Sequence, residues 1–314
     1  MIAVLAGGTG AAKFVRGLTG VVRQNELAII VNTGDDLQWW GLHVSPDIDT
    51  LIYCLAGCLD QSKGWGVSSD SFACLDQMSR FDEPTWFNVG DRDLALHLYR
   101  TRLLSEGQSL TEATRRVAEG LGVEARVLPM SDQSVRTMVH TPHGSLSFQE
   151  FFVRDRYKPE VIGVEYRNDC EIEPGPMVLE TIRTADAIII GPSNPITSIG
   201  PILSVPGIRQ AVCEAAAPVV CVSPIVGGSA VTGPAGQLMQ AEGFDVSVAG
   251  VAKVYEGLLD VIVADSQDAS QQHQLEAMGV TTCFTNTIMY DKSAAVQLAG
   301  AVLKQSSVVP KSAG

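Results

Sequence analysis

The amino-acid sequence predicts an α/β fold, a Rossmann-like parallel sheet with helices on both faces. Short apolar segments alternate with helical ones towards both ends of the chain, which is typical of parallel strands joined by crossover helices. The strand segments are almost continuously apolar, as in sheets covered on both faces. Polar, glycine-rich segments follow several strands directly, and that is where open α/β sheets bind ligands.

The core of this fold is predicted to comprise residues 1–53 and 166–305. Its expected strands are Ile2–Ala6, Leu27–Asn32, Ala187–Ile190, Val219–Val222, Val246–Ala249 and Val261–Ala264. Its expected helices are Ala11–Leu18, Gly207–Ala216, Ala235–Ala241, Ala252–Leu259, Gln271–Met278 and Lys292–Lys304. The length and period of the apolar positions distinguish the strands from the helices.

Residues 54–165 break this rhythm and are expected to form an insertion that acts as a lid or an acceptor-binding region. The pattern is mostly helical as far as Leu121 and then changes to short strands, with a hairpin through Thr141-Pro142-His143-Gly144,. Residues 306–314 are rich in Ser, Pro and Gly and are expected to be a frayed tail.

The composition excludes several classes of partner. A net charge of −13 argues against nucleic acid, which binds net basic faces. The chain starts in an apolar strand without a basic leader, and no apolar run approaches ~20 residues, so we expect a cytoplasmic protein that makes no membrane contact. The seven cysteines contain no C-x-x-C pair, and Cys54 and Cys58 are expected to pack in the core, not to bind zinc.

A glycine-rich segment directly follows the first strand, with Gly7, Gly8, Thr9, Gly10 and Lys13 as candidate phosphate ligands. Such glycines let the backbone approach a phosphate, and the start of the next helix offers free N–H groups. Phe14 follows Lys13, so this is no Walker A loop, and Lys13 replaces the third glycine of the dinucleotide fingerprint,. A tight turn without a ligand remains the alternative.

Two further polar loops follow strands in the second half of the chain. Their candidate nucleotide or phosphate ligands are Gly191, Ser193, Asn194, Ser198, Gly227 and Gly228. Because parallel strands end at one edge of a sheet, we expect all these loops to line one crevice.

An acidic segment adjoins the first loop. Asp35 and Asp36 end the second strand, and Asp47 and Asp49 follow shortly afterwards. Ser45 could cap a helix there, in which case Asp47 and Asp49 would only complement its dipole. Carboxylates beside a phosphate would otherwise repel it, so we expect these four aspartates to bind Mg²⁺.

A turn leads into a helix at Asn88–His97. Asp91 could cap that helix, and Arg92 and Asp93 could lie in its solvated first turn,; alternatively, all three belong to an acceptor-binding lid. Trp39, Trp40 and Trp65 place aromatic rings near polar segments, where they either stack on an aromatic acceptor or pack in the core.

With these motifs assembled, the chain resembles the 2-phospho-L-lactate transferase family of coenzyme F420 biosynthesis. The matching segments are Gly7–Gly10, Asn32–Asp36, Ser45–Thr50, Gly90–Asp93, Leu128–Asp132, Gly191–Gly200 and Gly233–Gly236. They span nearly the whole chain in the family's order.

The resemblance implies transfer of a phospho-acid group from a guanosine diphosphate donor to a deazaflavin hydroxyl, with release of GMP and a requirement for Mg²⁺. It also implies that Asp49 and Asn88 contact the deazaflavin. Asp47 and Asp49 are the candidate catalytic residues, with Asp49 a possible general base if burial raises its basicity. The identity of the acid, namely phospholactyl, phosphoenolpyruvyl or phosphoglyceryl, stays open, and a homodimer is expected.

Two other functions remain open from the residues. A non-catalytic nucleotide-sugar-binding regulator could use the same fold, since a fold does not assign chemistry. A dehydrogenase is disfavoured because the first loop lacks the third glycine of the fingerprint.

Overall fold

A seven-stranded parallel sheet forms the centre of the protein. The computed structural model describes residues 1–168 and 170–308. The strand order is β14-β13-β10-β9-β1-β2-β5. The strands are β1 (Ile2–Ala6), β2 (Leu27–Val31), β5 (Arg126–Pro129), β9 (Ala187–Ile190), β10 (Val219–Val222), β13 (Val261–Asp265) and β14 (Thr281–Thr285).

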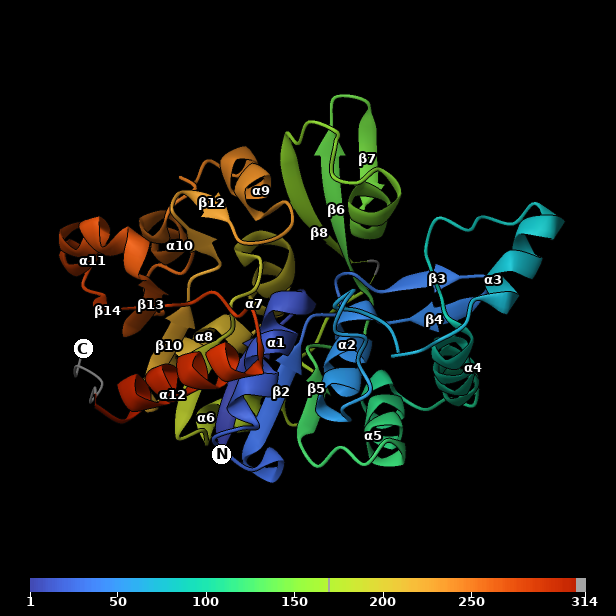
Figure 1. The fold of residues 1–314 in the computed structure, drawn as a ribbon, viewed down its shortest axis with the longest axis horizontal. Helices are drawn as coiled ribbons and strands as arrows, with labels where there is room; N and C mark the ends of the chain where they lie inside the picture. Colours follow the sequence, from blue (N-terminus) through green and yellow to red (C-terminus); the bar gives the residue numbers. More distant parts are fainter. Residues whose placement is uncertain (169, 309–314) are drawn as a thin grey trace.

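Helices cover both faces of this sheet (Figure 1). On β1, Val4 and Ala6 face one core and Ala3 and Leu5 the other, because side chains alternate along a strand,. The first face packs against α1 (Gly8–Leu18), α2 (Pro46–Leu55), α5 (Leu110–Gly120) and α12 (Lys292–Val308). The second packs against α6 (Val178–Arg183), α7 (Gly200–Ser204), α8 (Ile208–Glu214), α9 (Ala235–Ala241), α10 (Val248–Val254) and α11 (Gln272–Ala277). The expected Rossmann-like class is confirmed.

The strand order reverses beside β1. The chain runs from β1 through β2 to β5 on one side, and then from β9 through β10 and β13 to β14 on the other. A reversal of this kind opens a crevice at the carboxyl ends of the two adjacent strands, here β1 and β9. The loops that begin at Gly7 and Gly191 start at this point.

The remaining elements lie mostly beyond the carboxyl ends of the central strands (Figure 1). They include the hairpin β3 (Leu37–Trp39) and β4 (Leu42–Val44), the helices α3 (Ala73–Met78) and α4 (Asp91–Ser105), and the antiparallel strands β6 (Val135–Thr141), β7 (Gly144–Ser147) and β8 (Gly163–Asn168). A small hairpin joins β11 (Ile225–Val226) to β12 (Ser229–Ala230). Short 3-10 turns occupy Gln24–Glu26, Ser79–Phe81 and Ser266–Gln271, and π-helical turns occupy Glu150–Arg154 and Pro195–Ile199. Within the described ranges, no helix is both long and apolar enough to cross a membrane.

The predicted strand Val246–Ala249 is wrong. Helix α10 begins there at Val248, and the Ser247 hydroxyl caps it by accepting a hydrogen bond from the Gly250 N–H at 2.9 Å. A short apolar segment is compatible with a buried helix as well as with a strand. Here Ser247, directly before Val248, is the residue that indicates the start of a helix. The hairpin predicted around Thr141–Gly144 is confirmed by the pairing of β6 with β7.

Two strands of the central sheet were not assigned to it from the sequence. Strand β14 forms one edge of the sheet, and β5 forms the other by pairing with β2. The segment expected to be an insertion therefore supplies one core strand. At the other end, helix α12 includes residues 306–308 of the predicted tail, and the Ser306 and Ser307 hydroxyls donate to the Leu303 carbonyl. Residues 309–314 of the predicted tail lie outside the described residues.

Candidate active site

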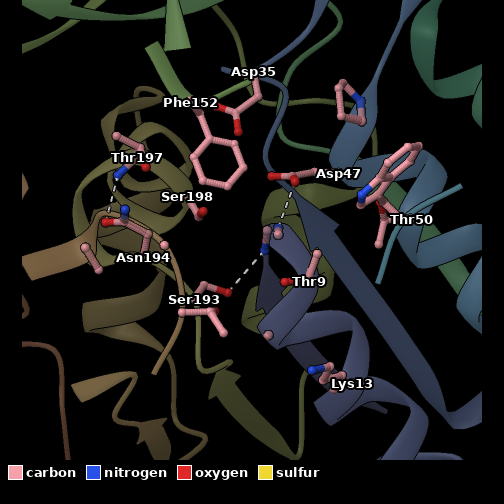
Figure 2. Close-up of a pocket in the computed structure, with 18 of the residues that line it drawn as sticks. Thr9, Lys13, Asp35, Asp47, Thr50, Phe152, Ser193, Asn194, Thr197 and Ser198 are labelled. Atoms are coloured by element: carbon pink, nitrogen blue, oxygen red, sulfur yellow. Dashed lines mark hydrogen bonds between the residues drawn. The ribbon is translucent and has the colours of Figure 1, made fainter. Parts of the chain in front are cut away.

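A cavity of about 530 Å³ lies at the carboxyl ends of the central strands. Loops that are far apart in the sequence line it, as expected from the strand order (Figure 2). Of the residues expected to bind ligands, those that line it are Gly7, Gly8, Thr9, Gly10, Lys13, Asp35, Asp47, Asp49, Asn88, Ser193, Asn194 and Ser198.

The glycine loop after β1 is tied to two other loops at the start of α1. The Gly8 N–H donates to Asp47 Oδ1 at 2.8 Å, and the Gly7 N–H donates to Ser193 Oγ at 3.3 Å (Figure 2). Gly8 has a φ of +73°, a conformation that glycine adopts without strain. Helix N-termini attract anions, so this turn holds the Asp47 carboxylate in place beside the cavity.

Asn32, at the end of β2, organises the same region and was not singled out from the sequence. Its amide donates to Asp47 Oδ2 at 2.9 Å and to the Thr197 carbonyl at 3.3 Å, and its Oδ1 accepts from the Gly34 N–H at 2.8 Å. The side chain is fully buried. A buried asparagine with its groups satisfied fixes the relative positions of the elements that it joins.

Asp35 and Asp47 are both buried and both line the cavity. Burial raises the pKa of Asp47 to about 6, against the opposing effect of its hydrogen bonds from Asn32 and Gly8. Burial and the nearby charge of Asp47 also raise the pKa of Asp35 well above its ordinary value. Asp35 Oδ1 has no hydrogen-bond partner among the described residues. An ionised carboxylate pair in this position calls for a cation.

The other two aspartates of the predicted metal set are bonded to protein side chains. Asp36 Oδ2 accepts hydrogen bonds from the Ser45 hydroxyl at 2.7 Å and lies 3.0 Å from His43 Nε2. Ser45 therefore does not cap α2 with its side chain, although it occupies the N-cap position. Nowhere in the described ranges do three or more His, Cys, Asp or Glu side chains form a group that could hold a metal. The four aspartates are thus not assembled as one ligand set.

Asp49 forms a buried ion pair beneath the cavity. Arg100 of α4, fully buried, donates to both Asp49 oxygens, with Nη1 at 3.0 Å from Oδ2. His97 Nδ1 lies 3.6 Å from the same carboxylate, and His97 Nε2 lies 3.3 Å from Asp93. Tyr53 donates to Asp93 at 2.6 Å, and burial together with Asp49 and Asp93 raises the tyrosine pKa far above its ordinary value.

This network was largely missed from the sequence. A solvated first turn was one of the two interpretations of Asp93, yet Asp93 is buried and lines the cavity together with Tyr53 and His97. The Asp93/His97 spacing of one helical turn on α4 was the available signal. Both oxygens of Asp49 are engaged by Arg100, which leaves neither free to take a proton in this structure.

Only some of the residues expected to bind the acceptor line the cavity. Asn88 lies at the rim of the cavity, whereas Asp91 and Arg92 do not line it. The Asp91 carboxylate instead accepts from the Ala73 and Cys74 N–H groups and caps α3. Asp70 caps α4 in return, by accepting from the N–H groups of Arg92 and Asp93. Asp91 is therefore a cap, but of a different helix from the one expected.

Three of the predicted glycines also lie away from the cavity. Gly227 and Gly228 form the two-residue turn between β11 and β12, with φ of +56° and +77°, and their backbone follows the usual geometry of such hairpins. The Gly227 N–H donates to the Asp268 carboxylate. Gly191 continues the backbone pairing of β9 with β1, and the cavity wall begins with its neighbour Pro192.

Aromatic side chains cover part of the cavity wall. Phe148 and Phe152 line it and stack with their ring centres 5.4 Å apart, and Tyr157 stacks on the outer side of Phe152 at 5.8 Å. Trp65 also lines the cavity, whereas Trp39 packs against Trp40 and Trp86 in a separate cluster beside it. The expected aromatic neighbourhood is present, but the phenylalanines were not identified from the sequence.

Replacement of Gly10 by alanine is expected to destabilise the protein by about 1–3 kcal/mol. The added Cβ would lie 2.4 Å from the Pro192 carbonyl oxygen, a backbone atom that cannot swing away. Denaturant-induced unfolding measures the effect. Gly300→Ala in α12 is the matched control, since no atom lies within 4 Å of its Cβ position, and it should stabilise by up to ~1 kcal/mol. Equal stability of the two variants would contradict this account of the close approach.

Comparison with known proteins identifies the family. The family model described as 2-phospho-L-lactate transferase CofD matches residues 2–300. The 2-phospho-L-lactate transferase of Methanococcoides burtonii is 43% identical over 286 residues, which cover 91% of this chain and 93% of that protein. The phosphoenolpyruvate transferase of Streptomyces griseus is 38% identical and covers 98% of this chain and 99% of its own.

A solved structure agrees in fold. The protein of the UPF0052 family from Bacillus halodurans superposes with a TM-score of 0.67 over 96% of this chain and 98% of its own, at 19% identity. Similarity at that level of identity concerns the fold alone. The sequence matches carry the assignment further: the chain is a transferase that belongs to the 2-phospho-L-lactate transferase family.

Proposed function

We propose that this transferase moves a phospho-acid group from a guanosine diphosphate donor to the hydroxyl of a deazaflavin acceptor and releases GMP. The acid is 2-phospholactyl, phosphoenolpyruvyl or 3-phosphoglyceryl. In the reaction, the acceptor oxygen forms a bond to the phosphorus that carries the acid, the bond from that phosphorus to the GMP oxygen breaks, and the hydroxyl proton is released. The observation that carries the proposal is the meeting of the α1 N-terminus with the buried Asp35 and Asp47 in one cavity.

The donor diphosphate fits the glycine loop side of the cavity. The first turn of α1 offers backbone N–H groups, and Lys13 and Ser198 line the same wall. Glycine at position 10 allows the backbone to pack closely against Pro192. Transfer between oxygens at phosphorus is accelerated mainly by positioning and charge neutralisation, both of which such a wall supplies.

Asp35 and Asp47 are the residues that would hold Mg²⁺. Their carboxylates face the same cavity, and Asp35 has an oxygen without a partner among the described residues. Magnesium binds through one or two carboxylates together with substrate phosphates and water, so a pair of aspartates suffices. When bound, it neutralises charge on the diphosphate. Asp36 is left out of this proposal because it does not line the cavity, and Asp49 because Arg100 engages both of its oxygens.

The planar acceptor fits the aromatic side of the cavity. Phe148 and Phe152 present stacked rings there, and Asn88 lies at the rim. Aromatic rings bind planar ring systems by offset stacking. Asp49 lines the cavity with its carboxylate paired to Arg100, and we assign it a positioning role in place of a general base.

The proposal is tested by incubating the protein with Mg²⁺, the deazaflavin acceptor and each of the three guanosine diphosphate donors in turn. We expect GMP and a phospho-acid adduct of the deazaflavin from at least one donor, identified by mass. Omission of Mg²⁺ should abolish both products. Neither adduct nor GMP with any donor would refute the proposed reaction.

Two broader expectations remain predictions. We propose that the protein acts in the cytoplasm and forms a homodimer. Sedimentation analysis tests the second of these, with a monomeric mass as the contrary outcome.

A further inference from the structure

A second, smaller cavity of about 210 Å³ adjoins the active-site cavity. The two share Thr9, Lys13, Met289 and Tyr290, so the side cavity continues from the main one. It runs along α1 towards the start of α12 and the end of α2, where Cys54 of α2 and Leu59 of the following segment line it. The function proposed above makes no use of it.

The side cavity is lined by three cations. Lys13 and Arg16 come from α1 and Lys292 from the first turn of α12. Within the described ranges, none of the three forms an ion pair with a carboxylate, and the half-buried Arg16 has a buried Nε without a hydrogen-bond partner. In a protein with a net charge of −13, unpaired cations gathered around one cavity indicate an anion site.

The single carboxylate in the lining does not neutralise this group. Asp291 precedes α12 and its Oδ1 accepts from the Ala294 N–H at 2.8 Å, so it serves as a helix cap. Apart from Asp291, the residues lining the cavity are cationic, polar or apolar.

The cations follow one face of α1 away from the phosphate loop. Thr9, Lys13 and Arg16 are spaced by four and three residues, so they lie on the same side of the helix,. Figure 2 shows Lys13 further along α1 than Thr9, away from Asp47. Lys13 reaches both cavities, whereas Arg16 lines the side cavity alone. A ligand with two separated negative charges could therefore meet Lys13 with one and Arg16 with the other.

We propose that the side cavity is the subsite for the carboxylate of the transferred phospho-acid. This inference rests on the proposed function. A volume of about 210 Å³ is below the range of roughly 300–1,000 Å³ usual for larger ligands and suits a three-carbon acid better than a nucleoside. Arg16 binds the carboxylate, since guanidinium groups match carboxylates in shape. The apolar Leu59 and Met289 contact the carbon chain.

Direct binding of small acids tests the subsite without turnover. Phosphoenolpyruvate, 2-phospholactate and GMP are titrated by calorimetry into the wild-type protein and into Arg16→Gln, with Arg23→Gln as the matched control. Arg23 is exposed and paired with Glu26 outside both cavities. Arg16→Gln is expected to weaken binding of both acids about 10-fold or more and to leave GMP binding unchanged, whereas Arg23→Gln should change neither.

The exposed Lys292→Gln provides a second variant in case Arg16→Gln alters folding, and should weaken binding of the acids about three-fold. The subsite is refuted if the wild-type protein binds neither acid, if both variants bind the acids like the wild type, or if Arg16→Gln weakens only GMP. If the acids bind in an Arg16-dependent way but no donor is turned over, the subsite stands and the proposed reaction fails. If transfer proceeds and its KM is unchanged in both variants, the reaction stands and the subsite fails.

Discussion

Replacement of Asp35 by asparagine is expected to lower kcat about 10²–10³-fold, the usual effect of removing one preorganised charge-stabilising group. Asp35 is buried, lines the cavity beside Asp47, and has an oxygen without a partner in the described part of the chain. Asparagine keeps the shape of the side chain but loses the charge that would hold Mg²⁺. Turnover with the productive donor measures the loss.

The same substitution is expected to raise the unfolding midpoint in the absence of Mg²⁺. Burial and the charge of Asp47 raise the pKa of Asp35. A folded-state pKa above the unfolded value means that the ionised form is disfavoured by folding at neutral pH, so removal of the charge relieves that cost. Active sites commonly reduce stability in this way.

The control for Asp35→Asn is Asp82→Asn. Asp82 is exposed, lies outside the cavity lining and has a φ of +57°, a conformation that asparagine also adopts. Added Mg²⁺ should raise the unfolding midpoint of the wild type and of Asp82→Asn, but not that of Asp35→Asn. Unchanged turnover in Asp35→Asn would remove the residue from the site. Loss of turnover together with a lower midpoint would show that its role is structural.

Replacement of Arg100 by methionine is expected to destabilise the protein by about 3–5 kcal/mol. Arg100 is fully buried and pairs with Asp49, which is 4% exposed. Methionine fills much of the space but leaves the Asp49 carboxylate buried without its partner, and that unpaired charge is the source of the loss. Urea-induced unfolding measures the difference.

Arg102, also on α4, is the matched control for Arg100. Its side chain is 58% exposed and pairs with Glu106 at 2.9 Å. Exposed pairs contribute about 0–1 kcal/mol, so Arg102→Met should have a small effect. Adding Asp49→Asn to Arg100→Met should recover part of the lost stability, because the buried charge is then absent. A loss in Arg100→Met no larger than that in Arg102→Met would contradict the assignment of a buried ion pair.

Several elements of the fold could be predicted because their determinants are local. The apolar strands β1, β9 and β10 and the helix α9 match their predicted ranges, since periodicity and flanking turn residues specify them. The strand predicted at Val246–Ala249 failed because a short, mostly apolar segment does not distinguish a strand from a buried helix. Strand β14, with exposed and half-buried residues, lacked the apolar pattern that identified the others.

The candidate site was also predicted in part, because some of its residues follow local sequence signals. Glycines after β1 and the acidic segment after β2 follow strand ends, so the sequence alone placed them near one another. The prediction for Gly227 and Gly228 failed, because glycines after a strand can either bind a ligand or form a hairpin turn. The pairing of β11 with β12 shows that these two form a turn,.

By itself, the sequence determined that this protein has a parallel α/β sheet, that its polar loops meet at the carboxyl ends of the strands, and to which family it belongs. Only the tertiary structure decided which aspartates face the cavity. Asp49 lines the cavity but is paired with Arg100, which lies 51 positions away along the chain. Asp36 does not line the cavity, whereas Asp35 lines it with an oxygen that has no partner among the described residues. A carboxylate is available to a metal where it faces the cavity and no protein cation already neutralises it, and both conditions depend on segments that meet only when the chain has folded.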